Sequence, residues 1–249
     1  LETMTEFHKK IASAIKNYHN EIIEFIQSAI HLPSLANNEG PVQELIAKKL
    51  SSFDLHVDHV PIHFETIKEH PAFYDDGFSP DSRYNIVGSW NNNGNGRSLI
   101  LNGHVDVVPT GPQENWSGSP WSGSINKDRI YGRGACDMKA GLISGIYALK
   151  ILIESGFKPN GNVQIQSVVG EESGGCGTLT NIVKGYTADG AIILEPTSLS
   201  ICPIQSGALT FRIIINGRAT HAATRWEGIS AIEKFEPVHQ AILDLEKDR

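Results

Sequence analysis

The chain has 249 residues, of which 40% are hydrophobic and 20% charged, a composition typical of globular proteins. Its net charge of −7 and its lack of a Lys/Arg cluster argue against nucleic acid as a partner. No apolar stretch approaches the ~20 residues needed to cross a bilayer, and no secretory signal is visible, so we expect no membrane partner. Three widely spaced cysteines (Cys136, Cys176 and Cys202) favour free thiols and predict a cytoplasmic location.

Helical and extended patterns alternate along the first two hundred residues. Apolar spacing predicts a long helix over residues 7–30, which could be broken, and Gly40-Pro41 opens a second helix over residues 42–50. Further helices are expected at residues 139–155 and 178–184, and strands at residues 55–60, 86–90, 98–102, 163–169 and 190–194. The aperiodic stretch of residues 61–84 is interpreted as a surface insertion.

This alternation predicts an α/β layered fold with a mostly parallel central sheet. The pattern changes near Gly207: a strand is expected at residues 209–215, a turn at Asn216-Gly217 and a helix at residues 229–245. We therefore expect a metal-binding catalytic domain over residues 4–206, with residues 1–3 left out, and the beginning of a second domain over residues 207–249. The chain stops in what looks like the middle of a βα unit, so we expect a fragment.

The chemistry-bearing residues stand in four turns that contain Gly or Pro. They are Gly103-His104-Val105-Asp106, Gly132-Arg133-Gly134-Ala135-Cys136-Asp137, Glu171-Glu172-Ser173-Gly174-Gly175 and Leu194-Glu195-Pro196-Thr197. Three of the four follow an apolar run that is typical of a buried strand. In parallel sheets, sites gather beyond the carboxyl ends of the strands. One histidine with several carboxylates and no cysteine pair is the ligand chemistry of a dinuclear hydrolytic metal site.

Each motif alone also has an ordinary structural interpretation. His104 and Asp106 point the same way on an extended segment, so Asp106 can orient the ring while His104 binds metal, but a strand-end turn would show the same residues. Asp137 could bridge two metal ions or cap a helix. Cys136 beside it is interpreted as a buried small residue rather than a ligand.

The adjacent acids Glu171 and Glu172 are more specific. They repel each other unless a cation or proton lies between them, so one can bind metal while the other, with a raised pKa, accepts a proton from water. An exposed acidic loop fits poorly with the glycines that follow. Pro196 restricts Glu195 to extended backbone, although a lone Glu-Pro is usually a turn. The four motifs together favour a metal site.

The motif series resembles peptidase family M20, which holds dinuclear-zinc deacylases and peptidases such as acetylornithine deacetylase and succinyl-diaminopimelate desuccinylase. The resemblance is carried by residues 103–109, residues 131–139, Glu171-Glu172 and residues 195–197. The insertion near Pro71 and residues 224–228 are most similar to the acetylornithine-deacetylase-like branch. The resemblance implies a three-layer zinc-peptidase-like fold, followed by the start of a smaller α+β lid and dimerisation domain.

The resemblance also implies a role for each motif residue. His104, Asp137, Glu172 and Glu195 would bind two divalent ions, with Asp137 as the bridge; zinc is expected, and cobalt or manganese would also fit. Glu171 would be the general base and later the general acid, and Asp106 the partner that orients His104. His221 would stabilise the oxyanion in a homodimer of the full-length protein. The peptide bond after Asp137 is expected to be cis. The family's last metal ligand, a histidine, would lie beyond residue 249.

Three functions remain open. The first is a hydrolase of an N-acyl bond in an amino acid or related small amine. The second is a dipeptidase or carboxypeptidase of the same family, which differs in the groups that flank the amide. The third is an inactive metal-binding fragment, which the missing last ligand favours. We expect the first, with an N-acylated amino acid or peptide as substrate.

Overall fold

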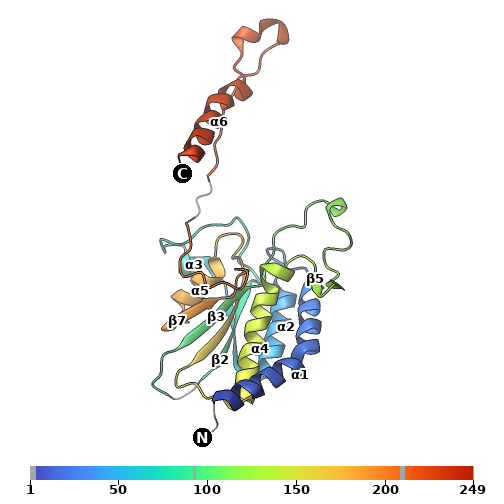
Figure 1. Ribbon diagram of the computed structural model, residues 1–249. Helices are drawn as coiled ribbons and strands as arrows, with labels where there is room; N and C mark the ends of the chain where they lie inside the picture. Colours follow the sequence, from blue (N-terminus) through green and yellow to red (C-terminus); the bar gives the residue numbers. More distant parts are fainter. Residues whose placement is uncertain (1–3, 92–93, 208–210, 249) are drawn as a thin grey trace. The chain divides into compact units, whose positions relative to one another are not determined.

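The computed structural model describes residues 4–91, 94–207 and 211–248 (Figure 1). The chain divides into two compact units, Leu1–Ser200 and Ile201–Arg249. This division lies a few residues before the boundary expected at residue 206. The assignment of the two parts to a catalytic and a lid domain remains a prediction.

A five-stranded sheet forms the centre of the described part of the first unit, with the strand order β1-β2-β6-β3-β7. Its strands are β1 (His56–Pro61), β2 (Tyr84–Trp90), β3 (Leu99–His104), β6 (Val163–Val168) and β7 (Gly190–Ile193). Strand β3 pairs in parallel with β6 and β7, whereas β2 pairs antiparallel with both β1 and β6. Within the described sheet β2 alone therefore runs against the other strands, so the sheet is mostly parallel, as predicted.

Helices cover both faces of this sheet. The helices of the first unit are α1 (Met4–Ile30), α2 (Gly40–Ser51), α3 (Phe64–Ile67), α4 (Ala140–Glu154) and α5 (Cys176–Val183). A Cβ atom on Gly88 of β2 would lie 2.9 Å from Leu50 of α2, so α2 packs directly on that face. Asn85 of β2 donates to Asn181 of α5 at 2.7 Å. Because residues three apart on a strand point to opposite faces, α2 and α5 sandwich the sheet, and the predicted three-layer α/β fold is confirmed (Figure 1).

The main core lies between the sheet and the layer formed by α1, α2 and α4. Its largest fully buried apolar side chains include Ile30, Ile46, Leu50, Leu142, Ile146 and Tyr147. Each such side chain contributes roughly 1.5–3 kcal/mol by leaving water. Helix α1 is unbroken, and it buries residues only near its carboxyl end. None of the helices in the described ranges is both long and apolar enough to cross a membrane.

Two buried amides tie the layers together close to the ends of the strands. Gln43 of α2 donates to the carbonyls of Tyr84 and Ser167 at 3.1 and 3.0 Å, and its own oxygen accepts from the Ser167 hydroxyl at 2.6 Å. On the other face, Asn85 accepts from the backbone N–H of Val169 at 3.1 Å. The backbone that leads out of β6 is therefore held from both sides, because these buried polar groups have partners in both helical layers.

The stretch interpreted as a surface insertion, residues 61–84, is only partly superficial. It contains α3, in which Ile67 is buried, and the rings of Phe64 and Phe73 meet edge to face at 5.3 Å. Near its end Arg83 is 3% exposed. The aromatic and charged residues of this stretch therefore make tertiary contacts. Their sequence shows no helical or strand periodicity, so these contacts cannot be predicted from the spacing of apolar residues.

The second unit has a turn, η3 (Ala222–Glu227), and helix α6 (Ala231–Lys247). Ser230 caps α6 by accepting from the backbone N–H of Glu233 at 3.2 Å. The predicted helix is confirmed. The strand expected at residues 209–215 is wrong for residues 211–215, which form no strand, while residues 209 and 210 lie outside the described residues. A strand needs a neighbour for its hydrogen bonds, and the described part of this unit supplies only an isolated bridge between Arg218 and Ile229.

Candidate metal centre

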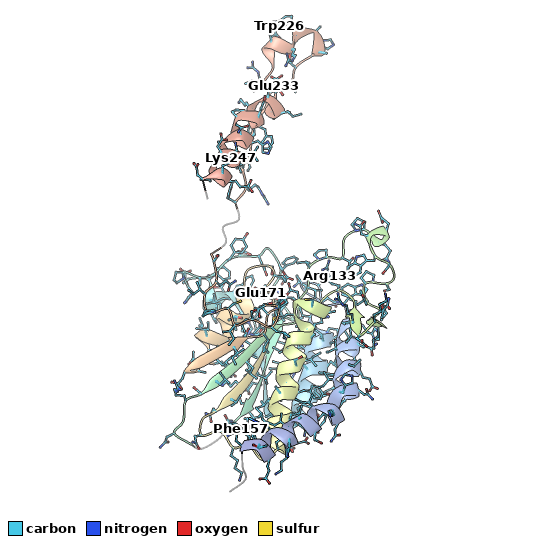
Figure 2. All side chains as sticks on the ribbon, in the orientation of Figure 1. Arg133, Phe157, Glu171, Trp226, Glu233 and Lys247 are labelled. Carbon is cyan, nitrogen blue, oxygen red and sulfur yellow. The ribbon has the colours of Figure 1, made fainter. Side chains whose placement is uncertain are left out.

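The candidate site lies at the carboxyl ends of β3, β6 and β7. His104 is the last residue of β3 and pairs with Val168 at the end of β6, while Leu99 pairs with Gly190 at the start of β7. The three strands are parallel, so the residues that follow them emerge at one edge of the sheet, where Figure 2 labels Glu171. The expected gathering of strand-end residues therefore has a direct structural basis.

His104 presents one ring nitrogen to the protein and the other to the carboxylates. Its Nδ1 lies 2.9 Å from the backbone oxygen of Asp106. Because a carbonyl oxygen only accepts, Nδ1 carries a proton and Nε2 is the nitrogen available to a metal. Nε2 lies 3.1 Å from Asp137 Oδ1, 3.6 Å from Glu195 Oε1 and 3.7 Å from Glu171 Oε2. Burial disfavours a charged ring, but the charges of Asp106, Glu195 and Glu171 outweigh burial and raise the pKa of His104.

Asp106 contacts both the His104 ring and the loop that follows β6. Its carboxylate lies 3.7 Å from the His104 ring, so the hydrogen bond that holds the ring comes from its backbone oxygen instead. The two carboxylate oxygens accept from the backbone N–H groups of Glu171 and Glu172 at 3.3 and 3.1 Å. Asp106 is 2% exposed, and it therefore joins the end of β3 to the loop after β6.

Asp137 lies in a turn, η2 (Ala135–Lys139), which leads into α4. The peptide bond between Asp137 and Met138 is cis, as expected. Lys139 is fully buried, and its ammonium group donates to the carbonyls of Ala29 and Leu32 at 2.8 and 3.0 Å. Burial lowers the pKa of Lys139 to about 8. The sequence patterns assign no role to Lys139. A single lysine directly before an apolar helix could have indicated that its side chain is buried.

The three glutamates of the site differ from ordinary surface carboxylates. Burial raises the pKa of Glu171, and burial followed by the charge of Asp137 raises the pKa of Glu172. Glu195 follows Leu194, whose N–H continues the β7 ladder by donating to Asn102 at 3.0 Å. Burial and then the neighbouring carboxylates raise the pKa of Glu195 to about 7, against the opposing effect of His104.

The donor atoms fall into two groups that share His104. Among the described residues, His104, Glu171 and Glu195 form one group, and His104, Asp137 and Glu172 form the other, with the donor atoms of each group within 4.8 Å of one another. Imidazole nitrogen with carboxylate oxygens is a donor set that suits zinc, cobalt or manganese. A bound cation would also offset the burial and the mutual repulsion that raise the pKa values of the three glutamates. The residues present therefore fit a divalent metal.

Cys136 and His221 belong to neither donor group of the described residues. Cys136 is exposed, so its interpretation as a buried small residue is wrong; the side chain of the adjacent Asp137 is exposed too. His221 lies in the second unit, where its Nδ1 accepts from the backbone N–H of Ala223 at 3.1 Å. The role of His221 at the metal centre remains a prediction.

The family model of peptidase family M20/M25/M40 matches residues 100–240, more than half of the chain. The matched range contains every residue discussed above as a ligand, base or oxyanion partner. The chain belongs to peptidase family M20/M25/M40. The resemblance inferred from the motif series is thereby confirmed at the level of the family.

Curated relatives of this M20 chain include two kinds of enzyme. It is 39% identical over 163 residues to the N-formyl-4-amino-5-aminomethyl-2-methylpyrimidine deformylase of Halalkalibacterium halodurans, a match that covers 61% of the chain and 38% of that relative. It is 30% identical over 216 residues to a probable succinyl-diaminopimelate desuccinylase of Staphylococcus aureus, covering 86% of the chain and 49% of the relative. The chain thus spans less than half the length of these relatives.

Solved structures agree on the fold. Human carnosine dipeptidase 1 superposes with a TM-score of 0.62 at 17% identity, over 74% of this chain and 40% of that one. An M20 family metallo-carboxypeptidase from Sulfolobus solfataricus superposes with a TM-score of 0.54 at 23% identity, over 71% of this chain and 36% of that one. Similarity at this level of identity establishes the shared M20 fold of the first unit.

Proposed function

We propose that this chain carries the metal-binding part of an amide hydrolase that removes an acyl group from an N-acylated amino acid or related small amine. The observation that carries the proposal is the pair of donor groups that share the buried His104. The names of two relatives, a deformylase and a desuccinylase, describe removal of an acyl group and support this class of substrate. Acetylornithine as the particular substrate, a homodimer and a cytoplasmic location remain predictions.

In this proposal His104, Asp137, Glu172 and Glu195 hold two divalent ions, of which zinc is the first candidate. When bound, the ions supply Lewis acidity toward the carbonyl oxygen and toward the attacking water. Among the described residues, the last histidine ligand expected from the family resemblance has no counterpart at this edge of the sheet.

Glu171 performs the proton transfers. Its side chain lies beside His104 and is 47% exposed, so water and substrate reach it. A base is most effective when its pKa is close to the operating pH, and burial raises the pKa of Glu171 in that direction. Glu171 takes a proton from water as the water oxygen bonds to the amide carbon, and returns it to the nitrogen as the C–N bond breaks. In the same proposal His221, from a second copy, donates a hydrogen bond to the oxyanion.

The test is the variant Glu171→Gln, compared with Glu172→Gln. The first removes the base and leaves the proposed ligands, so zinc content should be unchanged while turnover of N-formyl, N-acetyl and N-succinyl amino acids falls by about 10²–10⁴-fold. The second removes a ligand, so zinc content itself should fall. Near-normal turnover by Glu171→Gln would overturn the base assignment, and hydrolysis of dipeptides in preference to acyl amino acids would replace the deacylase by a peptidase.

A further inference from the structure

A buried ionic cluster lies directly behind the loop that carries Glu171 and Glu172. Arg83 Nη2 lies 2.9 Å from Glu39 Oε1, and its Nη1 lies 3.1 Å from Asp76 Oδ2. The three side chains are at most 2% exposed. Removing three charged groups from water is costly, and apolar residues of similar size often stabilise a protein equally well. Stability alone therefore does not explain why these three charged residues are buried here.

The cluster contacts the loop over residues 170–175 at several points. Asp76 Oδ2 accepts from the Ser173 hydroxyl at 2.7 Å. A Cβ atom on Gly170 would lie 2.7 Å from Arg83 Nη2, and one on Gly174 would lie 2.7 Å from the ring of Tyr74. The backbone of the loop thus rests against residues 74–83, a segment that precedes it by about ninety positions in the sequence.

The other side of the same loop is held by Asp106, whose carboxylate accepts the N–H groups of Glu171 and Glu172. Inside the loop, the backbone bonds are Gly174 N–H to Glu171 O at 3.2 Å and Gly175 N–H to Gly170 O at 2.6 Å. Asp106 fixes the two glutamates at their backbone, and Asp76 fixes the next residue by its side chain. The loop is therefore clamped between two buried carboxylates.

We propose that Asp76, held in place by Arg83, is a positioning residue that sets the direction in which Glu171 and Glu172 enter the metal centre through its bond to Ser173. This inference rests on the proposed function, because it concerns the same base and ligand. It assigns a role to a segment that the sequence pattern marks only as an insertion.

The first experiment compares Asp76→Asn and Ser173→Ala with a matched control, Asp75→Asn. Asp75 is the exposed neighbour of Asp76, and its carboxylate accepts from the backbone N–H of Gly77 at 2.9 Å, within its own turn. In the metal-free protein, amide hydrogen exchange at Glu171 and Glu172 should accelerate at least tenfold in both test variants and stay unchanged in the control. Zinc affinity, measured by competition with a chromophoric chelator, should fall about 10–100-fold, as for other residues that orient ligands.

Ser173→Thr keeps the hydroxyl and should restore both properties relative to Ser173→Ala. A merely structural cluster would give another result: Asp76→Asn would lower the unfolding midpoint in urea, while exchange at the two glutamates and zinc affinity matched the control. That result would overturn the proposal. Ser173→Ala leaves the buried ion pairs in place, so it decides the question even where Asp76→Asn folds poorly.

The same set of variants distinguishes the positioning role of Asp76 from the proposed hydrolase activity. Faster exchange and weaker zinc binding in the variants, with no hydrolysis of acyl amino acids by the parent, would support the positioning role and count against the proposed activity. Hydrolysis by the parent, with zinc affinity and exchange in Asp76→Asn equal to those of Asp75→Asn, would support the activity and overturn the positioning role.

Discussion

The metal centre has a closed half and an open half, built in different ways. The side chains of His104 and Asp106 are 1% and 3% exposed, whereas those of Asp137, Glu171 and Glu195 are 55%, 47% and 32% exposed. The closed half is fixed by the end of a central strand and by the packing around it. The open half consists of loop carboxylates, which water, metal and substrate can reach.

The two halves depend on different interactions. The closed half needs only the regular sheet, since His104 is the last residue of β3 and its ring bonds to backbone two residues on. The open half needs particular contacts made by residues far apart in the chain. Substitutions in the two halves should therefore change zinc binding in different ways.

We expect the greatest loss of zinc from His104→Ala, which removes the metal ligand of the closed half. Nε2 of His104 has one lone pair and can bind one ion, so the zinc retained after loading and desalting should fall by at least one ion per chain, as measured by elemental analysis. The control is His19→Ala, a change at an exposed position of α1. A zinc content equal to that of the parent would show that the carboxylates hold the metal without the histidine, contrary to the assignment of His104 as a ligand.

A smaller and more selective effect is expected from Gly141→Ala, which breaks one branch of the open half. A Cβ atom at this position of α4 would lie 2.0 Å from the carbonyl oxygen of Leu194, so the backbone that leads to Glu195 must move. The group containing Glu195 should lose its ion, while the group formed with Asp137 keeps its own. Zinc titration should then show one fewer site than in the parent.

The matched control for this change is Gly145→Ala, one helical turn further along α4. There the added Cβ would meet Leu194 Cδ1 at 2.6 Å, the end of a side chain that can rotate away. Its zinc content should equal that of the parent. Equal losses in the two variants would show that packing between α4 and Leu194, rather than the path of the backbone, governs the site.

The contact between the two halves can be tested by Asp106→Asn. The amide keeps the shape of the carboxylate but has only one accepting oxygen, so one of the N–H groups of Glu171 and Glu172 loses its partner. We expect zinc affinity to fall about 10–100-fold without loss of the fold. Asp128→Asn, at an exposed turn, should have no effect. Unchanged affinity in Asp106→Asn would leave the backbone oxygen as the only contribution of this residue.

Much of the closed half and of the fold could be predicted from sequence. Apolar runs with turn residues at their ends indicate buried parallel strands, and parallel strands bring their ends to one edge, so His104, Glu171 and Glu195 could be expected together. The helices α2, α4 and α5 agree with their predicted ranges to within a few residues. These elements can be predicted because they depend on the spacing of apolar residues that lie close together in the sequence.

The contacts of the open half could not be predicted in this way. Asp76 and Ser173 lie 97 residues apart, and nothing in the local pattern of either indicates the other. Likewise, the Asp106 carboxylate accepts from the backbone N–H groups of Glu171 and Glu172, and no pattern of side chains in the sequence reveals these two bonds. The strand expected at residues 211–215 failed for a related reason, since pairing depends on a partner and not on apolar alternation alone.

The smallest effect expected is a pH dependence of stability in the metal-free protein. The pKa of Glu195 is raised from 4.5 to about 7, so between these values the folded chain holds a proton that the unfolded chain has released. The free energy of unfolding should therefore decrease as pH rises from about 4.5 to 7. The raised pKa of His104 acts in the same direction, because the stabilisation from its charged form is lost as pH rises through that pKa.

Urea unfolding between pH 4.5 and 8 in the presence of EDTA measures this slope. Glu195→Gln removes one titrating group and should make the dependence shallower, whereas Glu114→Gln, at an exposed position, should leave it unchanged. Zinc should reverse the sign, because metal binding requires the deprotonated carboxylates and a neutral imidazole, so that stability with excess zinc rises over the same range. A slope that is identical in Glu195→Gln and in the parent would show that burial and the neighbouring carboxylates do not raise the pKa of Glu195 in the folded chain.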